Sequence, residues 1–207
     1  PTWFVDQLGH VIGPDALPPI PNLVVGPETY NEGLNAYASG LQVSSSDDLR
    51  GVLHRFPPEP DPTITGHVSA FLDGPQCASG LYDGDGMVST FLSSRAPAEI
   101  LGSGVLDSYF NFGALSSPGM DPGMPDLYAA FGVESLSGGA LTQALRGPLG
   151  QVMIAAQAIS RGVSQGVSIN LVSAIDHHDE DYATAHYPAL YESFDALSRL
   201  ISYLKAQ

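Results

Sequence analysis

Basic residues are scarce in this chain of 207 residues, which has 7 Lys and Arg against 22 Asp and Glu and a formal net charge of -15. Phosphate backbones and anionic lipid surfaces are bound through clustered Lys and Arg. No basic stripe exists here, so we expect neither nucleic acid nor an anionic membrane as a partner. The acidity instead favours solubility, cation binding, or a salty or extracellular setting.

Other signals are also absent from the sequence. Cys77 is the single cysteine, which excludes an internal disulfide. No apolar run reaches the roughly 18 residues of a membrane span. No signal peptide is visible, and the sequence starts at Pro1 without a Met, which suggests a processed product or a fragment. A serine esterase of the nucleophile-elbow type is disfavoured, because no Gly-x-Ser-x-Gly motif occurs.

The residues that are present predict a folded α/β protein. Hydrophobic residues make up 43% of the chain, and 23 Gly and 17 Pro indicate many turns and long loops. Short runs of β-formers predict strands at Leu23–Val25 and Val167–Ile175. Helical spacing of apolar residues predicts helices over 137–160, interrupted at Pro148, and over 185–206.

Weaker signals complete the expected organisation. A short helix is predicted to end at Gly132, and another to begin with Ser46 as its N-cap. Residues 1–19 read as a loop because of their Gly and Pro breakers, and 28–46, rich in Gly, Asn and Ser, reads as an extended surface segment. The final helix has an apolar stripe that we expect to pack in the core, made of Tyr187, Leu190, Tyr191, Phe194, Leu197, Leu200, Ile201 and Leu204.

Two strands are too few for a stable parallel sheet. We therefore expect a single, incomplete α/β domain over 1–207, with a loop-rich, insertion-like part at 1–125 and a helix–strand–helix unit at 126–207. The missing strands are expected from another chain or from another segment that completes the sheet.

The densest cluster of ionisable groups follows the second predicted strand. Open α/β sheets bind ligands at the carboxyl ends of their strands. In extended backbone Asp176 and His178 point the same way, while His177 points oppositely, and His186 could fold back across a short loop. One carboxylate and two imidazoles suit a Zn-like ion, and further oxygen ligands suit a harder Ca or Mg ion. Acidic residues before a helix also serve as caps, and loop histidines are often simply solvated, so both interpretations stay open.

Three segments carry a family resemblance. They are Leu17–Gly26 (LPPIPNLVVG) with the later Ala-Ser-Gly at 38–40, the Asp-Leu-Tyr to Gly helix at 126–132, and AAQAISRGV at 155–163 followed by the strand and Asp-His-His at 176–178. Together they resemble a sulfatase-like family of exported bacterial proteins in the alkaline phosphatase superfamily. The match is strongest over 126–207. It departs from the family pattern at Ile175, where the family usually has Trp, and at His177, where it has Thr.

The resemblance implies an alkaline-phosphatase-like parallel sheet, a periplasmic or extracellular location, and descent from metal-assisted hydrolases. It implies Asp176, His178 and His186 as candidate ligands of a divalent metal. The regions where superfamily members carry the nucleophile and the remaining ligands are not in this sequence, so catalytic residues are not assigned. This chain would correspond to the middle of such a protein.

Two functions compete at this point. One is metal-dependent hydrolysis of phosphate or sulfate esters, with Asp176 and His178 as ligands and His186 as a ligand or as a group that orients one. The other is a non-catalytic exported protein that keeps the fold and uses its long Gly/Pro loops for binding or assembly.

Overall fold

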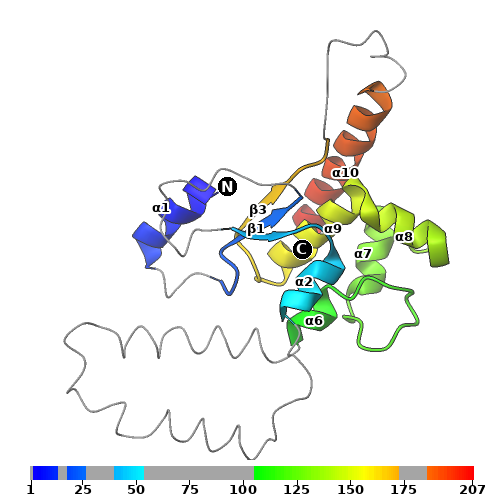
Figure 1. Ribbon diagram of the computed structural model, residues 1–207, viewed down its shortest axis with the longest axis horizontal. Helices are drawn as coiled ribbons and strands as arrows, with labels where there is room; N and C mark the ends of the chain where they lie inside the picture. Colours follow the sequence, from blue (N-terminus) through cyan, green and yellow to red (C-terminus); the bar gives the residue numbers. More distant parts are fainter. Residues whose placement is uncertain (1, 14–17, 27–39, 54–104, 173–185) are drawn as a thin grey trace, which may run out of the picture.

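The computed structural model describes residues 2–13, 18–26, 40–53, 105–172 and 186–207 (Figure 1). The strands are β1 (Asn22–Val25), β2 (Leu41–Val43) and β3 (Gly166–Ile169). The helices are α1 (Thr2–Ile12), α2 (Ser46–Leu53), α6 (Val105–Tyr109), α7 (Met124–Phe131), α8 (Gly138–Arg146), α9 (Pro148–Ser160) and α10 (Tyr187–Ala206).

The three strands form one parallel sheet in the order β2-β1-β3. Leu23 of β1 lies opposite Leu41 of β2 and Val167 of β3, and every residue of β1 is buried. The predicted strand at Leu23–Val25 is thus confirmed as the centre of the sheet. The mixed α/β class, with a parallel sheet flanked by helices, is also confirmed.

Two segments contain regular structure that was not predicted. Helix α1 lies within 1–19, so the expected loop there was wrong, because Gly9 interrupts the apolar spacing of α1. Strand β2 lies within the extended segment predicted over 28–46, and its three residues are too few to show an alternating pattern. Pairing with β1 and packing on the sheet decide these elements.

The two faces of the sheet are covered unequally. Leu23 and Val25 point to the face that packs against Ile154 and Ala158 of α9 and Leu49 of α2. The opposite face meets α1, where a Cβ at Gly166 would lie 2.6 Å from a methyl carbon of Val5. Most of the helices therefore lie on one side of the sheet, with α1 on the other (Figure 1).

Glycine and proline set the helix ends as predicted. Helix α7 ends at Gly132, which adopts a left-handed conformation (φ 70°) and donates its N–H to the carbonyl of Ala129. The predicted interruption at Pro148 is confirmed, because α8 ends at Arg146 and Pro148 opens α9. The N-terminal cap of α2 differs by one residue from the prediction, since Ser45 rather than Ser46 accepts the backbone N–H of Asp48.

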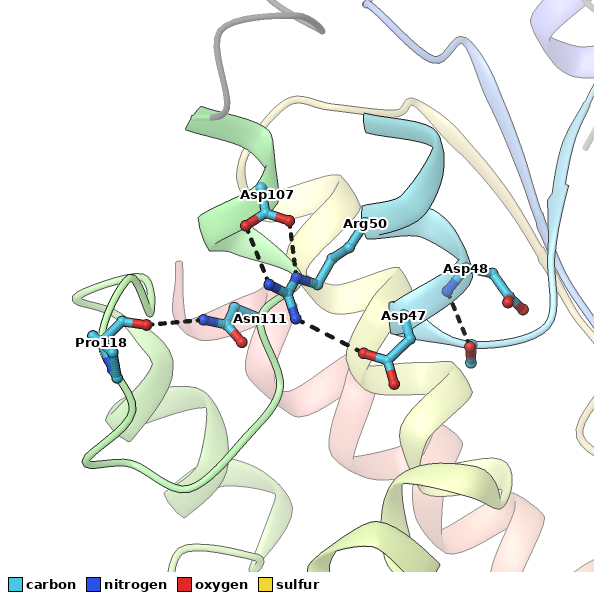
Figure 2. A network of polar contacts seen from close by, with 7 residues as sticks. Asp47, Asp48, Arg50, Asp107, Asn111 and Pro118 are labelled. Carbon is cyan, nitrogen blue, oxygen red and sulfur yellow. Dashed lines mark hydrogen bonds and ion pairs between the residues drawn. The ribbon is translucent and has the colours of Figure 1, made fainter. Parts of the chain in front are cut away.

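A polar network joins α2 to α6, two helices that are far apart in the sequence (Figure 2). Arg50 donates two hydrogen bonds to the carboxylate of Asp107, at 2.9 and 3.3 Å, and lies 3.8 Å from Asp47. Asn111 donates to the carbonyl of Pro118 at 3.2 Å. The two hydrogen bonds between Arg50 and Asp107 hold α2 beside α6. Both helices therefore cover the same part of the sheet.

Helix α10 confirms the predicted extent and half of the predicted packing. Its buried residues are Ser193, Ala196 and Leu200, and three more leucines of the predicted stripe are half-buried, Leu190, Leu197 and Leu204. The other four stripe residues are exposed, at 64% for Tyr187, 63% for Tyr191, 67% for Phe194 and 47% for Ile201. The leucines and small side chains of α10 thus face inward, and its aromatic residues at these positions face outward.

Within the described residues, no helix combines the length and the apolar character that crossing a membrane requires.

Candidate functional site at the carboxyl edge of the sheet

Because all three strands are parallel, their carboxyl ends meet at one edge of the sheet, where open α/β sheets bind ligands. Helix α9 precedes β3 and packs against it, running in the opposite direction, so the first turn of α9 lies at this same edge. The edge is therefore built from the residues that follow the strands and from the start of α9.

Gly26 makes the closest approach at this edge. Its φ of 111° is unfavourable for any residue with a side chain. A Cβ at Gly26 would lie 3.1 Å from the Cβ of Asn170 and 3.6 Å from Oε1 of Gln151. The backbone N–H of Gly26 donates to the carbonyl of Val43, and Gln42 donates its side-chain amide to the carbonyl of Gly26 at 3.1 Å.

Among the described residues, the side chains that meet beside Gly26 are amides rather than charged groups. Oε1 of Gln151 is shielded from solvent and accepts no hydrogen bond from the described residues. Oγ of Ser168 is likewise shielded and has no hydrogen bond to the described residues. Asn170 donates its backbone N–H to the carbonyl of Val25. These groups can orient a polar ligand, but they carry no charge to activate one.

Strand β3 ends at Ile169, six residues before the predicted end at Ile175. Its partner β1 ends at Val25, and within the described residues the last bond of the ladder is the one that Asn170 donates to the carbonyl of Val25. The extension of the strand over 170–172 was therefore wrong. The parallel orientation expected for Asp176 and His178 assumed that extension, and it loses this support.

His186 is the one predicted site residue that the structure describes. It lies directly before α10 in helical conformation (φ -78°, ψ -41°), is half-buried, and makes no side-chain capping bond. Its Nδ1 atom is shielded from solvent. Asp176 and His178 lie outside the described residues, in the segment that links the carboxyl end of β3 to His186.

The described residues by themselves do not form a metal site. No three His, Cys, Asp or Glu side chains among them lie close enough together to hold an ion. Of the three predicted ligands only His186 is among the described residues, and Asp176 and His178 lie outside them.

A cavity of about 540 Å³ between α7, α8 and α10 was not expected from the sequence. Its walls are mainly apolar, and Arg199 enters it from α10. The guanidinium of Arg199 bonds Asp195 at 2.7 Å and donates to the carbonyl of Phe131 at 2.9 Å. Arg199 therefore provides a hydrogen-bond donor for a backbone carbonyl at the C-terminal end of α7. The only sign of this role in the sequence was the four-residue spacing between Asp195 and Arg199.

No family model matches the chain, and no curated protein or solved structure is significantly similar to it. The chemistry of the edge therefore depends on its own residues, and the sulfatase-like resemblance stays a prediction.

Proposed function

We propose that the chain is part of an exported, periplasmic or extracellular protein with an alkaline-phosphatase-like fold that hydrolyses phosphate or sulfate esters with a divalent metal. The supporting observation is the position of His186. It lies directly before α10, the helix that follows β3 in the chain, and the Asp176–His178 cluster falls in the sequence between the carboxyl end of β3 and this half-buried imidazole.

In this proposal Asp176 and His178 hold the metal, and His186 serves as a further ligand or donates a hydrogen bond that orients one. A bound Zn-like or Ca/Mg-class ion would polarise the ester oxygen. The charge of -15 on the chain opposes the approach of an anionic ester. A cation bound to Asp176 would neutralise the negative charge nearest to the ester and so weaken this repulsion.

The uncharged side chains at the edge have a positioning role. Gln42, Gln151 and Asn170 offer amide donors and acceptors beside Gly26, whose lack of a side chain lets Asn170 and Gln151 approach closely. They would orient the ester without adding negative charge.

Metal analysis of the intact protein and hydrolysis assays with p-nitrophenyl phosphate and sulfate test this proposal. We expect bound metal, activity that a chelator removes, and at least about a hundredfold loss of activity in Asp176→Asn and His178→Ala. His10→Ala, on the exposed surface of α1, is the matched control and should keep full activity. Undiminished activity in both site variants would reject these roles.

The alternative function is a non-catalytic exported protein that binds a partner or assembles through this fold. The large exposed side chains of α10 favour it, because such surfaces mark interaction sites. It predicts that neither stability nor binding depends on metal. Another chain or segment that extends the sheet beyond β3 would be one such partner, since Val167 and Ile169 direct their backbone groups away from β1.

A further inference from the structure

Helix α10 carries its large apolar side chains on the side opposite its buried face. Tyr187, Tyr191, Phe194 and Ile201 are separated by four, three and seven residues, so they lie in one row along the helix. Ser198 and Lys205 occupy the remaining positions of the same four-three spacing and are also exposed. We call these six residues the outer stripe, and their spacing is that of a helix–helix seam.

The outer stripe is complementary to itself when a second copy runs in the opposite direction. Reversal about Ala196 places Tyr187 opposite Lys205, Tyr191 opposite Ile201, and Phe194 opposite Ser198. Each pairing suits its members, because a lysine ammonium is attracted to an aromatic face, an aromatic ring packs on an aliphatic side chain, and a large side chain meets a small one.

We propose that the outer stripe is the interface of an antiparallel homodimer whose two-fold axis crosses α10 at the level of position 196, midway between Phe194 and Ser198. Such an interface uses the same patch on both copies, and this requires the self-complementarity that the stripe has. The stacked rings of Tyr187 and Tyr191, with centroids 6.4 Å apart, already present a joined apolar surface to the partner copy.

The size of the stripe indicates a dimer that dissociates on dilution. Fully buried aromatic side chains each cover about 150–250 Å². At the exposures of the outer stripe, two copies would bury roughly 800–1,000 Å², just below the 1,200 Å² or so of stable specific interfaces. Each copy also carries a net charge of -15, so salt should strengthen the dimer by screening repulsion.

Sedimentation equilibrium over a range of protein concentrations tests the proposal. We expect a monomer–dimer equilibrium that shifts toward dimer as salt is raised, and a dissociation constant at least about tenfold higher for Phe194→Lys. Val11→Lys, at an 81% exposed apolar position on α1, is the matched control and should leave the dimer unchanged. A monomer at every concentration, or equal loss in both variants, would overturn the proposal.

Disulfide trapping tests the antiparallel direction in a Cys77→Ser background. A mixture of Ser198→Cys and Phe194→Cys chains should give a cross-linked heterodimer, and Ser198→Cys alone should give several-fold less. Preferential cross-linking of Ser198→Cys to itself would indicate a parallel pair and overturn the register. The interface is independent of ester hydrolysis, so an inactive protein that dimerises, or an active one that stays monomeric, separates the two proposals.

Discussion

Helices α9 and α10 lie against each other, yet they are buried in opposite ways. Seven consecutive residues of α9, from Val152 to Ala158, are buried. In α10 only Ser193, Ala196 and Leu200 are buried, although α10 is the longer helix and has the clearer apolar stripe. Apolar periodicity therefore identified both helices but did not indicate how deeply either one is buried.

The difference follows from what surrounds each helix. Helix α9 contacts the sheet through Ile154 and Ala158, and it contacts α7, α8 and α10 on its other sides. Helix α10 has neighbours on one side only among the described residues. Free energy from burial should accordingly be concentrated in α9.

Truncation of one large side chain on each helix gives the largest expected contrast. Met153→Ala should lower the free energy of unfolding by about 2–5 kcal/mol, because Met153 is fully buried. Phe194→Ala should change it by less than about 0.5 kcal/mol in the monomer, because the side chain is already exposed. Urea titration at low protein concentration measures both, and similar costs would erase the contrast between the helices.

The start of α9 offers a second test of tight packing. A Cβ at Gly150 would collide with the backbone carbonyl of Leu145, which cannot rotate away. We expect Gly150→Ala to lower the unfolding free energy by about 1–3 kcal/mol. Gly139→Ala, where nothing lies within 4 Å of the added carbon, should be neutral or slightly stabilising. Thermal denaturation of the pair compares them directly, and a harmless Gly150→Ala would contradict the close α8–α9 corner.

Tyr128, in the core beside α9, predicts a loss of stability at alkaline pH. Burial raises the pKa of Tyr128 from 10.0 to about 12, because the phenolate is disfavoured away from water. A raised folded pKa means that the contribution of Tyr128 is complete below pH 10 and is lost as the pH rises from 10 to 12. Stability measured across this range should fall less steeply in Tyr128→Phe than in the parent chain.

Tyr128→Phe should also cost about 1 kcal/mol at neutral pH, since Tyr128 donates a hydrogen bond of 2.9 Å to the carbonyl of Gly113. An identical alkaline slope in the variant and the parent would show that other groups cause the loss.

The ion pair between α2 and α6 shows how little a partly exposed interaction is expected to contribute to stability. Arg50→Lys keeps the charge but loses the two-bond fork to Asp107, and should cost about 0.5–1 kcal/mol. Asp47→Ala should cost almost nothing, because Asp47 is exposed and lies 3.8 Å from Arg50. Denaturant titration measures the loss of stability in both variants. A larger loss in Asp47→Ala than in Arg50→Lys would contradict the assignment of Asp107 as the main partner of Arg50.

Local chemistry was predictable where one residue decides the backbone. Gly132 ends α7 through its left-handed conformation, and Pro148 separates α8 from α9 because its ring cannot continue a helix. Strand β2, helix α1 and the end of β3 were not predictable, because each depends on whether a partner from a distant part of the chain is present. At the candidate site, the role of His186 stays a prediction, and the sequence gave no signal that Gly26, Gln151 and Asn170 converge.

By itself, the sequence determined the α/β class, the acidic surface and the boundaries of the long helices, because composition and helix-ending residues act within a few positions of the chain. The tertiary structure alone decided which strand is central, which side of α10 faces inward, and which amides gather at the carboxyl edge of the sheet. These features depend on contacts between residues far apart in sequence, where the close fit of small side chains such as Ala196 prevails over the hydrophobicity of large ones such as Phe194.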